Sequence, residues 1–303
     1  MEQNKTEHSV LFIRTLKKWI PVLPVIGVVV ALALSGGLVM DFDKDIGHFV
    51  FGSGSFYVMT VGIIAAVVVS AILGVRARGK FSLVQYPESV PLSICSSYFT
   101  AVMAAVTAVA SLYDVFVLKL HTGSTLEPLS AVLFPAIAIS MLLGSHEKTR
   151  QSVVRILFAI LAALAVNLNM FACYFDFTLP LNSPVRNVIT IAQAGVMLLL
   201  LSEVRLALSE KKRATAPFYV FTSAFAASAV LGISFGLCVY GFVSPDAADM
   251  GISIYRFACY FGVGLLGLSR LLALDTAAGT YVAPEPEESE PEDYNKSFAD
   301  EKK

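Results

Sequence analysis

Charged residues are scarce in this chain. Only 15% of its 303 residues are charged and 56% are hydrophobic, whereas about a quarter of the residues in an ordinary soluble domain carry a charge. The mean hydropathy is +0.72. This composition excludes a soluble globular domain and predicts a protein that is embedded in a lipid bilayer.

Cysteine and histidine are also rare, with four residues of each. These numbers are too small for a disulfide scaffold or an array of zinc sites. The net charge of −1 provides no basic surface for nucleic acid. The chain also lacks the Walker A, H-E-x-x-H and G-x-S-x-G motifs of common ATPases, zinc peptidases and hydrolases. We therefore expect neither an enzyme nor a metal or cofactor site, with a membrane enzyme of scattered catalytic residues as the alternative.

Long hydrophobic runs, in contrast, are abundant. A helix needs about 20 mostly apolar residues to cross a hydrocarbon core of roughly 30 Å, and an open sheet would leave its backbone groups unpaired in lipid. We predict an all-α integral membrane protein with eight transmembrane helices arranged as four hairpins, over residues 19–275. The predicted spans are 19–40, 55–75, 93–116, 127–144, 153–175, 188–208, 218–243 and 252–274.

Basic residues predict the orientation of the helices. With the N-terminus inside, eighteen Lys and Arg residues fall on the inner side and four on the outer side. Cytoplasmic loops are enriched in these residues, so the basic segment 1–18 and the C-terminus are both predicted to be cytosolic (N-in/C-in). Short loops suit a bacterial inner membrane. A cleaved signal peptide is the alternative for the first run, although that run is longer than the roughly 7–15 apolar residues of such peptides.

An acidic segment follows the last predicted span. Residues 281–303 contain eight acidic and three basic side chains and show no apolar periodicity, as is typical of disordered chains. We predict a disordered, acidic cytosolic tail over 276–303. This tail is either a docking segment for a cytosolic or membrane protein partner or a solvated extension without a partner.

Polar residues within the spans are the best indication of a site, because burying them in a membrane is costly. Asn169 and Asp176 share one face of the fifth span, and Arg256 and Tyr260 lie at a similar depth on the eighth. We predict a pocket in the outer half of the membrane for a small polar or anionic solute. Its candidate residues are Asp114, Asn167, Asn169, Asp176, Gln193, Arg256 and Tyr260.

The same residues also have a structural interpretation. Asn and Gln side chains hydrogen-bond between membrane helices, and Arg256 alternatively extends to the outer headgroups or pairs with Asp176 or Asp114. On the inner side, Glu203 and Arg270 are predicted to form an ion pair, which would satisfy two costly charges. A structural pair is favoured over a proton relay, because no other buried carboxylate or histidine is predicted to continue a path.

One face of the seventh span consists of small residues at every fourth position. Such stripes allow membrane helices to approach closely. We expect this stripe to pack against glycines of the eighth span, with a homodimer seam as the alternative. The stripe is Ala224, Ser228, Gly232 and Gly236, and the expected facing residues are Gly262, Gly264 and Gly267.

Two functional hypotheses follow from these patterns. The first is a small-solute permease or a membrane ligand-binding protein that uses the outer-half pocket. It is weakened by the lack of a charged site at mid-membrane and of a clearly broken helix, both common in transporters. The second is a structural or regulatory membrane subunit that acts through helix packing and its acidic tail.

Overall fold

Helices make up nearly all of the chain that the computed structural model describes. The described residues are 13–14, 16–78, 81–83, 87–118, 125–175, 180, 182–208, 217–247 and 250–280. Asp176 and the predicted tail beyond residue 280 lie outside these ranges. The long helices are α2 (Val22–Met40), α3 (Gly54–Ala77), α4 (Pro91–Phe116), α5 (Leu126–Leu133), α6 (Pro135–Ser145), α7 (Val153–Tyr174), α8 (Pro184–Leu208), α9 (Pro217–Phe225), α10 (Leu231–Val243) and α11 (Ile254–Leu272).

Short elements connect or extend these helices. Two antiparallel ribbons pair β1 (Phe42–Asp43) with β2 (His48–Phe49), and β3 (Phe81–Leu83) with β4 (Ala278–Thr280). Residues 276–280, which the sequence assigned to the tail, therefore belong to ordered elements. The short helices are η1 (Pro87–Ser89), η3 (Pro245–Ala247) and α12 (Leu274–Ala277), and η2 (Ala226–Val230) is a π-helical segment between α9 and α10.

Seven helical segments of the described chain are long and apolar enough to cross a membrane. Their limits lie close to those of the first seven predicted spans, so the expectation of a helical multi-pass membrane protein is confirmed. The eighth predicted span corresponds to α11, which has 19 residues, carries Arg256 and Arg270, and is not among the seven. The segments are Leu16–Met40, Gly54–Ala77, Pro91–Phe116, Leu126–Ser145, Val153–Tyr174, Pro184–Leu208 and Pro217–Val243.

Local sequence signals explain several helix boundaries. Ser53 Oγ accepts a hydrogen bond from the backbone N–H of Phe56 at 3.2 Å, and Ser152 Oγ accepts one from Arg155 at 3.2 Å. Both serines are N-caps, which satisfy donors that the first turn leaves free. Pro135 cannot donate a backbone hydrogen bond, and it divides the fourth span into α5 and α6.

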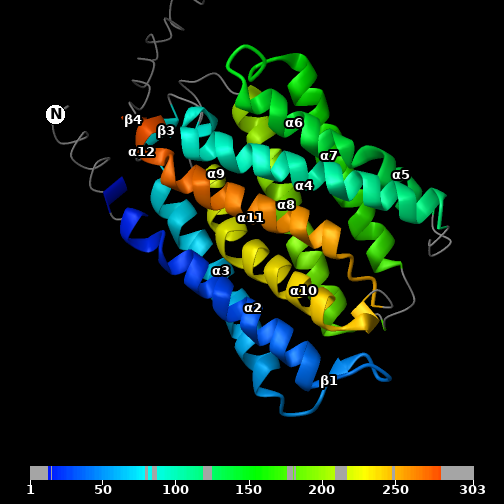
Figure 1. Ribbon diagram of the computed structural model, residues 1–303. Coiled ribbons are helices and arrows are strands. Elements are labelled where there is room, and N and C mark those ends of the chain that lie inside the picture. The colour runs from blue at the N-terminus through cyan, green and yellow to red at the C-terminus, as the bar shows by residue number, and fades with distance from the viewer. Residues whose placement is uncertain are drawn as a thin grey trace, which may run out of the picture.

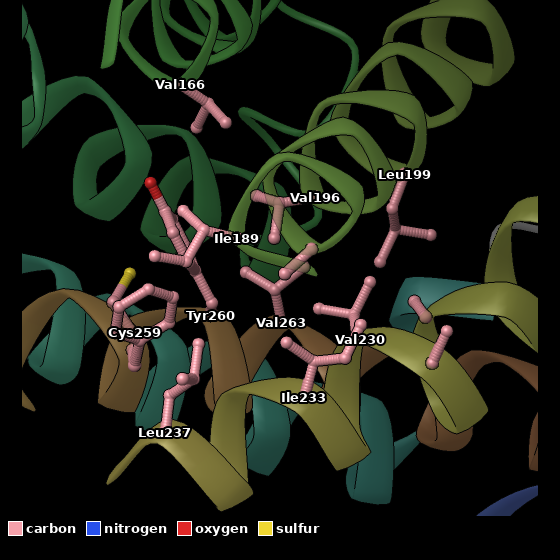
Figure 2. Close-up of a cluster of buried hydrophobic side chains, with 14 of the residues drawn as sticks. Val166, Ile189, Val196, Leu199, Val230, Ile233, Leu237, Cys259, Tyr260 and Val263 are labelled. Carbon is pink, nitrogen blue, oxygen red and sulfur yellow. The ribbon is translucent and has the colours of Figure 1, made fainter. Parts of the chain in front are cut away.

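The continuous helix α9–η2–α10 lies in the middle of the bundle (Figure 1). It contacts α2 and α3 on one side and α8 and α11 on the other, while α4, α6 and α7 complete the bundle beyond them. A large hydrophobic core fills this junction, and Figure 2 shows Val196 of α8, Val230 of η2 and Val263 of α11 close together within it.

The two ends of the bundle differ in the elements that lie there. Leu16, Leu73, Leu206, Tyr219 and Leu271 form one hydrophobic cluster. It joins the segment before α2 to the last turns of α3, α8 and α11, and we call this the terminal end. The β1–β2 ribbon lies at the opposite end (Figure 1), which we call the hairpin end.

The small-residue stripe packs against α2, and the prediction that it packs against the following helix was wrong. A Cβ added at Gly232 would lie 2.8 Å from the Cα of Gly27, and one added at Gly236 would lie 2.9 Å from the carbonyl oxygen of Ala31. The carbonyl oxygen of Ser228 similarly lies 2.9 Å from a Cβ added at Gly27. The stripe is thus occupied within the chain and does not provide a homodimer seam.

The π-helical segment η2 explains how the stripe stays on one face. Four residues advance more than one α-helical turn of 3.6 residues, so a stripe at this spacing drifts around a regular helix. The wider π turn counteracts this drift between Ser228 and Gly232. Gly264 of α11 packs on another face of the central helix, because a Cβ there would lie 2.7 Å from the Cα of Leu231. The central helix therefore uses separate faces for α2 and α11.

Candidate functional site

Five polar side chains from α7, α8 and α11 lie together toward the hairpin end. Asn169 Nδ2 donates to Tyr260 Oη at 3.2 Å, and Figure 2 shows the Tyr260 hydroxyl pointing away from α10. Gln193 Nε2 and Arg256 Nη1 approach Cys173 Sγ at 3.5 Å and 3.9 Å. We call these five residues, Asn169, Cys173, Gln193, Arg256 and Tyr260, the amide cluster.

Two buried polar atoms of the amide cluster, Gln193 Oε1 and Arg256 Nε, have no hydrogen-bond partner among the described residues. A buried polar atom without a partner costs about 1–3 kcal/mol, and a water or an ion commonly satisfies such atoms in native proteins. Among the described residues, Arg256 Nη2 pairs with Glu127 Oε1 at 4.0 Å, and the predicted pair with Asp114 is not formed. The cluster thus presents one acceptor atom, Gln193 Oε1, and one guanidinium donor atom, Arg256 Nε, that have no hydrogen-bond partner among the described residues.

Three predicted pocket residues are not part of the amide cluster. Asn167 is half-buried two positions before Asn169, on a different side of α7. Asp114 is half-buried near the end of α4 and, within the described chain, bonds to no member of the cluster. Asp176 lies outside the described residues. The structure brings together four of the seven candidates: Asn169, Gln193, Arg256 and Tyr260.

A second polar cluster lies near the terminal end. Arg270 Nε of α11 donates to Glu203 Oε1 of α8 at 2.8 Å, so the structure brings this predicted pair together. Glu203 Oε2 accepts from Arg155 Nη2 of α7 at 3.1 Å, and the same nitrogen bonds Glu88 Oε1 of η1. Arg150 Nε, just before α7, lies 3.8 Å from Glu88 Oε2. We call Glu88, Arg150, Arg155, Glu203 and Arg270 the charge cluster.

The charge cluster is buried and is supported by polar groups of several elements. Four of its five side chains are only 1–3% exposed. Arg270 Nη2 donates to Ser97 Oγ of α4 at 3.1 Å. Arg155 Nη1 donates to the Arg150 carbonyl at 2.8 Å, and Arg150 Nε donates to the Gly144 carbonyl at 3.1 Å. Buried charges are tolerated only with such additional hydrogen bonds, so the cluster links η1, α4, α6, α7, α8 and α11.

Sequence reasoning missed Glu88 and the participation of Arg150 and Arg155. Both arginines were counted only among the basic residues of the inner side. A signal was present for Glu88, which is the only acidic residue between Arg76 and the third span. The sequence does not reveal, however, which of the many loop arginines fold inward.

No family model, curated protein or solved structure matches this chain. The fold itself defines the class, which is a multi-pass membrane protein built from apolar helices. The two polar clusters, one toward each end, are where this chain departs from a purely apolar bundle.

Proposed function

We propose that this chain binds a small polar or anionic solute at the amide cluster, as a permease or as a membrane ligand-binding protein. The observation that supports this function is the pair of buried, unpaired atoms Gln193 Oε1 and Arg256 Nε. Guanidinium groups favour carboxylate and phosphate oxygens, and an amide oxygen accepts from an N–H or O–H group. A solute that carries both kinds of group satisfies both atoms.

We further propose that α11 is an eighth span and that both termini are cytosolic. Its 19 residues extend about 28 Å at 1.5 Å per residue, and it packs against α4 on one side and α10 on the other. The segment before α2 and the end of α11 share the terminal end, where the predicted inner basic residues lie. The short loops favour the bacterial inner membrane.

Native mass spectrometry of the full-length protein, extracted gently from its own membrane, tests the solute site. We expect the wild type to retain a small molecule, and Arg256→Gln and Asn169→Ala to lose it. Asn167→Ala is the matched control, because Asn167 lies on the same helix but outside the amide cluster, and this variant should retain the molecule. A wild-type spectrum with only protein and lipid would contradict the proposal, as would retention by all three variants.

The alternative of a structural or regulatory membrane subunit loses one of its two supports. The small-residue stripe packs against α2 within the chain, so this face is not available to another protein. The remaining support is the acidic tail. A co-purifying protein that is lost when residues 281–303 are deleted would favour the subunit over the solute-binding protein.

A further inference from the structure

Two buried carboxyl groups of the charge cluster meet at one nitrogen atom. Arg155 Nη2 bonds both Glu88 Oε1 and Glu203 Oε2, so the two carboxyl groups are neighbours. Two negative charges this close together raise each other's energy in a buried site, and one of the pair then tends to keep a proton.

The two glutamates are bonded differently. Both oxygens of Glu203 accept from guanidinium groups, from Arg270 at 2.8 Å and from Arg155 at 3.1 Å. Glu88 Oε2, in contrast, is buried and has no hydrogen-bond partner among the described residues. Arg150 Nε lies 3.8 Å from this oxygen but donates to a backbone carbonyl. The arginines therefore hold Glu203 as the anion, and Glu88 is the carboxyl group with a free oxygen for a proton.

We propose that Glu88 is a proton-binding site, which holds a proton on its carboxyl group at neutral pH and releases it to bulk water in alkaline solution. The site does not depend on whether a solute binds at the amide cluster, because the two clusters share no residue. The sequence predicted a structural ion pair between Glu203 and Arg270. The proposed site contains a second carboxyl group, that of Glu88 in η1.

Charged groups from several elements face Glu88. Arg150 and Arg155 approach it from the α7 side, Glu203 from α8, and Arg270 Nη2 of α11 lies 4.0 Å from Glu88 Oε1. The buried side chain of Tyr219, in α9, lies close enough to the cluster for the charges of its glutamates and arginines to act on it.

η1 also packs against α4, α6 and α12. The described residues of α6 carry no charge, and His146, which follows α6, is exposed and lies 3.5 Å from the Tyr98 hydroxyl of α4. α4 also carries Cys95, which is exposed, and Tyr113 and Asp114, which lie near the end of the helix far from η1. Asp275 of α12 is titratable as well, and its side chain lies outside the described part of the chain.

The electrostatics of the site support this assignment. Burial raises the pKa of Glu88 from 4.5 to about 8, with a further rise from the charge of Glu203, while Arg155 and Arg270 oppose the rise. Because the pKa is higher in the folded state, Glu88 stabilises the fold fully below about pH 4.5. This contribution decreases as the pH rises and is lost above about pH 8.

The protonation state of Glu88 determines which of the two glutamates is the anionic partner of Arg155. When Glu88 is neutral, Glu203 is the anionic partner of Arg155 Nη2. When Glu88 is ionised, two carboxylates compete for the same nitrogen. Since Glu88 lies in η1 before α4 and Glu203 lies in α8, loss of the proton shifts Arg155 of α7 toward η1. Protonation thus changes the contact between the start of α4 and the α7–α8 pair.

Infrared difference spectroscopy of the full-length protein across pH tests the proposal. We expect the wild type to show the carbonyl band of a buried protonated carboxyl group, which disappears with a midpoint near pH 8. Glu88→Gln should lack this titration, and the matched control Glu127→Gln should keep it. Glu203→Gln should shift the midpoint to lower pH, because the neighbouring negative charge is gone. A band that persists in Glu88→Gln, or no such band in the wild type, would overturn the proposal.

Thermal unfolding in detergent provides an independent readout. The wild-type Tm should fall as the pH rises from about 6 to about 8, and Glu88→Gln, an isostere of the neutral acid, should fold and lose this decline. Glu203→Gln should instead lower the Tm at every pH, because Arg155 and Arg270 lose a shared anion. A wild-type Tm that is flat or rises over this range would contradict the proposal, as would a Glu88→Gln variant that fails to fold.

Discussion

Gly232 of α10 lies directly against Gly27 of α2, and a Cβ added at Gly232 would lie 2.8 Å from the Cα of Gly27. Neither backbone leaves room for a side chain at this crossing. Close packing of small residues is a main source of helix association in lipid, because apolar side chains gain little by leaving one apolar environment for another. This contact therefore attaches the central helix to the first span.

Gly232→Ala is expected to destabilise the protein by about 1–3 kcal/mol, the usual cost of overpacking a tight core. Gly36→Ala is the matched control, because a Cβ added at Gly36 on α2 meets no atom within 4 Å. Alanine there should leave stability unchanged or raise it by about 0.5–1 kcal/mol. Unfolding of both variants in detergent measures the difference, and equal stabilities would contradict the close crossing.

Gln193→Met should separate the stability of the amide cluster from its function. The substitution replaces the amide by an apolar group of similar length and so removes a buried oxygen that has no hydrogen-bond partner among the described residues. The proposed function assigns this amide to solute binding and not to stability. The variant should then be at least as stable as the wild type, since such an oxygen costs about 1–3 kcal/mol, and it should lose the retained small molecule. A loss of stability together with normal retention of the molecule would instead identify Gln193 as a structural link between helices.

Arg270→Gln should be among the most damaging single changes in the chain. It leaves Glu203 with Arg155 as its remaining cationic partner, and removing one partner of a buried pair costs about 3–5 kcal/mol. Arg76→Gln is the control, because Arg76 is exposed at the end of α3 and surface changes are usually within about 0.5 kcal/mol. Similar unfolding curves for the two variants would show that the charge cluster does not stabilise the fold.

The pKa of Asp41, just after α2, should lie below 3.8, the ordinary value of an aspartate side chain. The hydroxyl groups of Ser55 and Ser53 donate to its carboxylate and lower its pKa, with a small opposing effect of burial. Because the folded-state pKa is lowered, the stabilisation is present above about pH 4 and is lost as the pH falls through the folded pKa. Carboxyl-resolved NMR titration checks this, with Asp41→Asn to assign the signal. A signal that titrates at or above 3.8 would contradict the expected direction.

The positions of the spans could be predicted from the sequence because they depend only on length and hydropathy. The depth of Glu203 and Arg270 could be predicted for the same reason, since each lies a fixed number of residues from a helix end. The lateral order of the helices is not encoded in hydropathy. For this reason the partner of Gly232 and Gly236 was predicted to be α11, whereas it is α2.

The polar clusters could be predicted only in part for a related reason. Helical spacing placed Asn169 and Tyr260 at a similar depth, and their side chains do meet. The rotation of each helix about its axis decides whether a polar residue turns inward, and Asn167 turns to a different side. Glu88 could not be predicted as a cluster member because η1 is a short element without periodicity, positioned by packing against α4, α6 and α12.

The pairing of β3 with β4 determines how mechanical load on the C-terminal extension enters the bundle. Thr280, the last described residue, is opposite Phe81 in the ribbon, so a pull on the extension acts on α3 through β3 as well as on α11 through α12. The ribbon thus works as a second tether, and any force on the extension is divided between two helices. Because α12 also packs against η1, part of that load reaches the element that carries Glu88.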